Sequence, residues 1–148
     1  MKNVFTILVI GLATSFASAQ TIKEAALPTA VKDAFTKQHP NTKVDSWEKE
    51  GNNYEVEFHL DKIENSIVYS SAGTLIQLET EIAVVELPKA ITDYIAKNIP
   101  DKKVKEAARI IDPTGNISYE AEVDGIDFIF DANGTIIKKE VEKENDKD

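Results

Sequence analysis

Two stretches of the chain carry the same pattern of apolar and polar positions. Apolar residues recur at helical spacing in residues 29–38 and again in 89–98, and each stretch follows Leu-Pro and stops before another proline. Proline fits the N1 position of a helix and pushes the residue before it out of helical conformation. The pattern therefore predicts helices over Thr29–Gln38 and Lys89–Asn98, with Pro28 and Pro88 at N1.

A strand pattern follows each predicted helix. Tyr54, Val56 and Phe58 point to one face of a strand, and the acidic residues between them point to the other. Similar runs occur in 66–69, 119–123 and 126–130, separated by Gly- and Asn-containing turns, with a longer middle hairpin in the first copy. Each copy is thus predicted as one helix and about four antiparallel strands, an α+β fold with the helix on one sheet face.

The ends of the chain differ from this repeat. Residues 1–19 combine Lys2, an apolar run and Ala17-Ser18-Ala19, which is typical of a signal peptide cleaved after Ala19. Repeat unit 1 is predicted over 20–84, repeat unit 2 over 85–142, and a charged flexible tail over 143–148. The product is expected in the periplasm or secreted, without a membrane-spanning segment.

The amino-acid composition excludes several kinds of site and partner. The 148 residues include no Cys, and 26 acidic against 17 basic side chains give a formal charge of −9. The lack of Cys excludes disulfides, thiolate metal sites and a lipid-modified cysteine. The acidic balance argues against nucleic acid as a partner, because that polyanion is bound by clustered basic residues.

A family resemblance rests on these same motifs. Five motifs follow one another along the chain: Leu-Pro-x-Ala-Val at residue 27, Trp-Glu-Lys-Glu at 47, Tyr-Glu-Val-Glu-Phe at 54, the turn at Gly73 and the second Leu-Pro at 87. Together they resemble the PepSY-like, β-lactamase-inhibitor-like exported proteins of Bacteroidetes. The resemblance implies a curved antiparallel sheet with both helices on one face, and a free face that engages another protein. It carries no inhibitory residue onto this chain.

Catalytic arrangements are not indicated, and we expect no enzyme and no cofactor. The only histidines, His39 and His59, are interpreted as solvated side chains. Carboxylate pairs about 7 Å apart along a strand could suit glycoside hydrolysis, but they are also typical of a solvated sheet face. No EF-hand spacing is present, which leaves a weak Ca²⁺ site as the cation alternative.

The acidic sheet face is the predicted binding surface. Trp47, the single Trp, fits either an aromatic anchor on that surface or a core residue under the first helix. We expect a monomer whose acidic face favours a basic protein or peptide. The predicted function is an exported, non-enzymatic module that engages or inhibits another protein, and the alternative is a periplasmic protein that binds a cation or small ligand. The predicted partner-binding residues are Trp47, Glu55, Glu57, His59, Val68, Glu120, Glu122 and Ile129.

Overall fold

The computed structural model describes residues 20–141, which fall into two compact units. The first unit ends at Leu78 and the second begins at Glu79, whereas the Leu-Pro repeat had suggested 84/85 as the boundary. The predicted signal peptide (1–19), residue 142 and the predicted charged tail (143–148) lie outside the described residues. Within the described part of the chain, no helix is long and apolar enough to cross a membrane.

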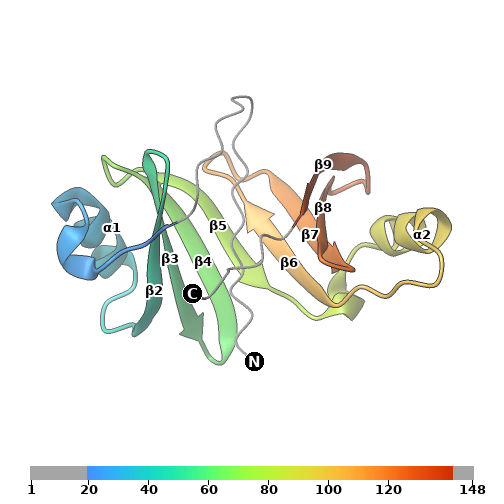
Figure 1. Ribbon diagram of the computed structural model, residues 1–148, viewed down its shortest axis with the longest axis horizontal. Helices are drawn as coiled ribbons and strands as arrows, with labels where there is room; N and C mark the ends of the chain where they lie inside the picture. The colour runs from blue at the N-terminus through green and yellow to red at the C-terminus, as the bar shows by residue number, and fades with distance from the viewer. Residues whose placement is uncertain (1–19, 142–148) are drawn as a thin grey trace. The chain divides into compact units, whose positions relative to one another are not determined.

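The first unit packs one α-helix against an antiparallel sheet whose strands follow chain order (Figure 1). Its strand β5 runs across the boundary into the second unit. The elements are β1 (Gln20–Thr21), η1 (Glu24–Ala26), α1 (Thr29–Gln38), β2 (Val44–Glu50), β3 (Asn53–Leu60), β4 (Ile63–Ser70) and β5 (Leu75–Glu81).

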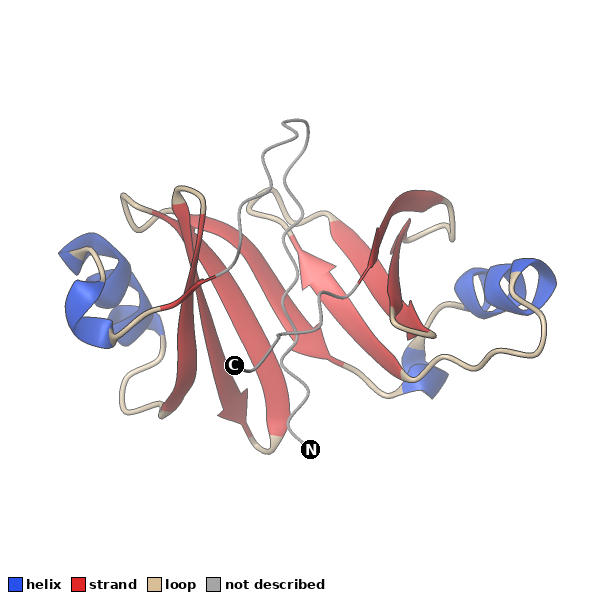
Figure 2. Cartoon of the chain, viewed as in Figure 1, coloured by secondary structure: helices blue, strands red, loops and turns tan. Residues whose placement is uncertain are grey.

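The second unit repeats this arrangement, again with antiparallel neighbours in chain order (Figure 2). Its elements are η2 (Val84–Glu86), α2 (Lys89–Asn98), β6 (Glu106–Ile111), β7 (Ile117–Val123), β8 (Ile126–Asp131) and β9 (Ile136–Val141). The predicted α+β class is confirmed, with one helix and about four strands in each copy.

Both α-helices have the predicted bounds, and their ends follow from the flanking prolines. Pro28 occupies the N-cap position, one residue before the predicted N1, and its carbonyl accepts the first helical hydrogen bond from the Val31 N–H. The helix ends where His39, the residue before proline, leaves the helical conformation. Val31 and Phe35 are buried against the sheet, which fixes α1 on one sheet face.

Trp47 belongs to the core of the first unit. It is 5% exposed, and its ring meets the Phe35 ring edge to face at 5.6 Å between centroids. The prediction of Trp47 as an exposed partner anchor is therefore wrong, and the alternative interpretation as a core Trp holds. Burial of this large ring outweighs any surface role because it removes much apolar area from water.

In both units the Gly-Thr turn packs against the start of the α-helix. Gly73 has φ +74°, and a Cβ there would lie 2.3 Å from the Ala30 carbonyl oxygen; at Gly134, with φ +83°, it would lie 2.6 Å from Ala90 Cβ. The Gly-Thr turn thus packs directly on the first turn of the helix that Leu-Pro begins. Only glycine combines this backbone conformation with this close approach.

The hairpin between β3 and β4 is longer than its counterpart in the second unit, as predicted. β3 and β4 have 8 residues each, against 7 in β7 and 6 in β8, because the strands continue to Leu60 and Ile63. Asp61 and Lys62 alone make the turn, with φ values of +52° and +72°. This pair of left-handed residues is the backbone of a type I′ turn, which normally selects Asn or Gly.

Candidate functional site

Apart from Trp47, the predicted partner-binding residues lie on the sheet face opposite each helix, but most of them are buried. The Glu55, Glu57, Glu120 and Glu122 side chains are at most 7% exposed, and Val68 and Ile129 are also buried. Of the predicted face only His59 is open, with half of its side chain exposed. The expectation of a wet acidic face is therefore wrong for these carboxylates, although they do share the face opposite the core.

A β-bulge in β2 shapes the polar cluster of the first unit. Val44 pairs with Phe58 and Ser46 with Glu57, so Asp45 is an extra residue in β2. Bulges re-aim side chains and often occur beside functional sites. Here the bulge lets two consecutive residues reach the same neighbouring strand: Asp45 contacts His59, and Ser46 contacts Glu57.

Glu57 lies at the centre of this cluster. The Ser46 hydroxyl donates to Glu57 Oε2 at 2.6 Å. Burial raises the pKa of the Glu57 carboxyl to about 7, against the lowering effect of the Ser46 bond, and the charges of Glu48, Glu64 and Asp45 raise that pKa further. Near neutral pH the Glu57 carboxyl is therefore partly protonated.

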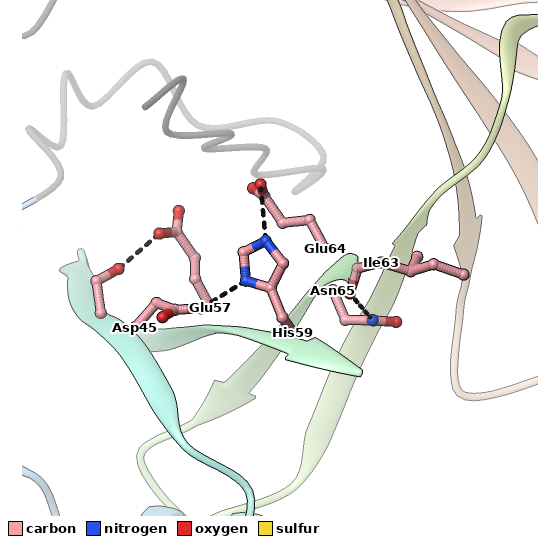
Figure 3. Close-up of polar contacts among 7 residues, drawn as sticks. Asp45, Glu57, His59, Ile63, Glu64 and Asn65 are labelled. Atoms are coloured by element: carbon pink, nitrogen blue, oxygen red, sulfur yellow. Dashed lines mark hydrogen bonds and ion pairs between the residues drawn. The ribbon is translucent and has the colours of Figure 1, made fainter. Parts of the chain in front are cut away.

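His59 joins two carboxylates at the exposed rim of the cluster (Figure 3). Its Nδ1 donates to Asp45 Oδ2 at 2.6 Å, and its Nε2 lies 3.9 Å from Glu64 Oε2. The Asp45 side chain is 43% exposed and that of Glu64 is 27% exposed. The rim is thus acidic and open to solvent, next to the buried Glu57.

Ser66 completes the cluster on β4. It is the direct cross-strand neighbour of Glu57, which places both side chains on the same sheet face. Ser66 is 6% exposed, and within residues 20–141 its Oγ and Glu57 Oε1 are buried without a hydrogen bond. A buried hydroxyl normally has a partner, so this position can still accept one. We call Asp45, Ser46, Glu57, His59, Glu64 and Ser66 the Glu57 site.

The second unit has an acidic row at the equivalent place. The row consists of four acids that are successive cross-strand neighbours: Glu106 on β6, Glu122 on β7, Asp127 on β8 and Glu140 on β9. Lys105 contacts both carboxylate oxygens of Glu122, at 3.1 and 3.2 Å, and Lys138 pairs with Glu140. Glu122 itself is 1% exposed, so Lys105 neutralises a buried charge.

Sequence reasoning found Glu57 and His59 but missed the rest of the Glu57 site. Asp45 and Ser46 lie on β2, Glu64 and Ser66 lie on β4, and only the strand register brings them together around β3. The one local signal is the polar pair Asp45-Ser46 between Val44 and Trp47, which interrupts the alternation and marks the bulge.

The two histidines have different surroundings. Ser46 donates to a carboxylate, and the His59 ring nitrogens face Asp45 and Glu64. His39 is not fully solvated as predicted: its ring stacks on Phe35 with centroids 5.2 Å apart, and burial lowers its pKa.

Solved structures share this fold at low sequence identity. A putative periplasmic protein from Bacteroides eggerthii matches with a TM-score of 0.67 and 15% identity, covering 78% of this chain and 88% of its own. A DUF2874 family protein from Bacteroides uniformis gives a TM-score of 0.66 and 18% identity, with coverages of 77% and 88%. A BLIP-like protein from Bacteroides fragilis gives 0.60 and 19%, with coverages of 82% and 92%. No curated protein matches the chain.

The family comparison matches the chain in two consecutive segments. The family described as "Putative beta-lactamase-inhibitor-like, PepSY-like" matches twice, over residues 15–77 and 78–138. Each match spans one helix and its strands, and together they cover most of the chain. The chain therefore belongs to this PepSY-like family.

Proposed function

We propose that this protein is an exported, non-enzymatic binding module that engages a basic protein of the cell envelope or the surrounding medium. The export part draws support from a structural neighbour described as a putative periplasmic protein and from the signal-peptide pattern of residues 1–19. The binding part draws support from the β-lactamase-inhibitor-like family and from the Glu57 site.

The observation that carries the proposal is the direct opposition of like charges on the sheet face away from each helix. Glu48 lies opposite Glu55, and Glu106 lies opposite Glu122. Directly opposed like charges destabilise a sheet, and buried carboxylates add a desolvation cost. Lys105 offsets the charge of Glu122 in the second unit, and we assign the remaining negative charge of this face to recognition.

The exposed contact region is the rim of the Glu57 site rather than the whole acidic face. Asp45 and His59 are each about half exposed, while the Glu57 carboxylate beneath them is nearly covered. A basic partner is attracted to the rim by long-range charge and held by contacts closer to Glu57. Such association weakens as salt is raised, since exposed charges are screened within about 10 Å at 0.1 M.

The cation-binding alternative receives less support. Among residues 20–141, no group of three or more His, Asp or Glu is arranged to hold a metal ion. The four-acid row of the second unit already contains Lys105 and Lys138 as counter-ions.

Affinity purification tests the proposal. The protein is immobilised and exposed to an envelope extract of the source organism at low salt, and retained proteins are identified by mass spectrometry. The matched control carries Gln at Glu55, Glu57, Glu120 and Glu122, with folding checked by circular dichroism. We expect a basic protein that is retained by the parent chain and lost with the control or at 0.5 M salt. Retention of nothing, or equal retention by the folded control, contradicts the proposal.

A further inference from the structure

The two units can be compared position by position around a buried central glutamate, which is Glu57 in the first unit and Glu122 in the second. Pro100, Val104 and Lys105 follow Pro40, Val44 and Asp45 at one constant offset in the chain. Ser46 pairs with Glu57 exactly as Glu106 pairs with Glu122 in the strand register. Asp45 and Lys105 are therefore equivalent positions, each directly preceding the residue that pairs with the central glutamate.

This one position carries opposite charges in the two units. In the second unit the Lys105 ammonium contacts both oxygens of buried Glu122. In the first unit a second acid, Asp45, takes its place and turns to His59. Within the described part of the chain, Glu57 makes no ion pair with a Lys or Arg, and its single side-chain hydrogen bond comes from Ser46.

Polar atoms beside Glu57 remain available for an incoming donor. Glu57 Oε1 is buried without a hydrogen bond, and so is Oγ of Ser66, the residue directly across on β4. Ser66 is more than nine-tenths buried, and a buried hydroxyl normally has a hydrogen-bond partner. Its hydroxyl is therefore an indication of a ligand position that does not depend on the acidic charges. An ammonium group has three donors and no acceptor, which matches a carboxylate oxygen and a hydroxyl that both accept.

We propose that the Glu57 site is a receptor for the ammonium group of a lysine side chain from a protein partner, which takes the place that Lys105 fills in the second unit. The inference rests on the proposed binding function and specifies its chemistry. The ammonium contacts Glu57 Oε1 and Ser66 Oγ, with Asp45 and Glu64 as the nearby acids of the rim. A lysine is favoured over an arginine because a compact ammonium already fits the equivalent position in the second unit.

Apart from His59, the charged groups around Glu57 are acids and favour a cation. Asp45 and Glu48 lie on β2, Glu55 and His59 on β3, and Glu64 on β4. His59 is the one basic group among them, and it is held by Asp45 and Glu64 at the rim. An arriving ammonium stabilises the ionised form of Glu57, so binding near pH 7 releases a proton. With the Glu57 pKa at about 7, about half a proton is released per bound lysine at that pH.

Calorimetry with a defined probe tests the proposal. The probe is an acetylated, amidated peptide of alternating Gly and Lys, compared with its Arg counterpart, its lysine-acetylated form and the free diamine putrescine. Titrations at pH 7 in two buffers of different ionisation enthalpy give both the affinity and the protons released. Two variants address the site: Asp45→Lys supplies the counter-ion from within the chain, and Glu57→Gln removes the charge. Asp33→Lys, on the exposed side of α1, makes the same charge change away from the site.

The proposal predicts that the Lys peptide binds with proton release and that the acetylated peptide does not bind. Asp45→Lys and Glu57→Gln each weaken binding about tenfold or more, as for the loss of one charge-assisted contact, and abolish proton release. Asp33→Lys leaves both nearly unchanged. Stronger binding of the Arg peptide, equal losses in Asp45→Lys and Asp33→Lys, or tight binding of putrescine alone would each overturn the lysine assignment. If an envelope partner is still retained by folded Asp45→Lys and Glu57→Gln, the lysine site is refuted while the binding function stands.

Discussion

Replacing Glu57 by Gln removes one buried charge from the first unit and changes its shape very little. The Gln carbonyl still accepts the bond from the Ser46 hydroxyl, which is 2.6 Å from the carboxylate in the parent chain. The effect on stability therefore isolates the cost of ionising this carboxyl. That cost depends on pH in a direction that the structure fixes.

The magnitude follows from the raised pKa. The Glu57 pKa is about 7 in the folded protein and 4.5 for an ordinary Glu, so the folded state binds more protons between these values. The stability contribution of this group is then complete below pH 4.5 and is lost as pH rises through 7. At about 1.4 kcal/mol per tenfold change, the loss is about 3 kcal/mol, or about 2 kcal/mol after allowance for solvent screening.

Trp47 makes the measurement specific to the first unit, because it is the only Trp and lies in that core. Urea unfolding is followed by Trp47 fluorescence at pH 4.5 to 8.5 for the parent chain and Glu57→Gln. We expect equal free energies of unfolding near pH 4.5, and a variant about 2–3 kcal/mol more stable at pH 8.5. A difference that does not change with pH, or a variant less stable at pH 8.5, would refute a buried ionising Glu57.

Three further predictions concern other parts of the fold. Gly134→Ala should lower the free energy of unfolding by more than about 2 kcal/mol, because the new Cβ meets α2. Gly115→Ala has open space around the new Cβ and should lower it by about 1 kcal/mol. Chemical denaturation of the two variants measures the difference. Lys105→Ala should destabilise by about 1–3 kcal/mol by leaving buried Glu122 without its counter-ion, and circular dichroism in urea measures this. Hydrogen bonds from Thr114 and Asn116 lower the pKa of the Asp112 carboxyl to about 2, so this group should titrate near pH 2 by NMR. Its contribution to stability should disappear as pH falls from 3.8 toward 2. A midpoint near 3.8 would contradict the turn geometry.

The helices could be predicted closely from sequence because their limits are set locally. Prolines flank each one, and the buried positions Val31, Phe35, Ile91 and Ile95 follow the helical period. The alternation of Tyr54, Val56 and Phe58 likewise fixed which strand face meets the helix.

The Glu57 site could not be predicted in the same way because it depends on contacts between strands. Alternation places Glu57 on the acidic face but does not show that the side chain is buried, which depends on tertiary packing. The bulge at Asp45 shifts the register by one residue, and no periodic pattern anticipates such a shift. The left-handed Asp61-Lys62 turn was missed for a related reason, since Lys rarely adopts that conformation.

The direct test of the lysine-receptor account is the pKa of the Glu57 carboxyl, measured by carbon NMR with and without a saturating Gly-Lys peptide. The account predicts a midpoint near 7 for the free protein and a fall of one pH unit or more when the peptide is bound. The Asp45→Lys variant should show the lowered midpoint without any peptide. A Glu57 midpoint that is the same in the free and the peptide-saturated protein would contradict the account.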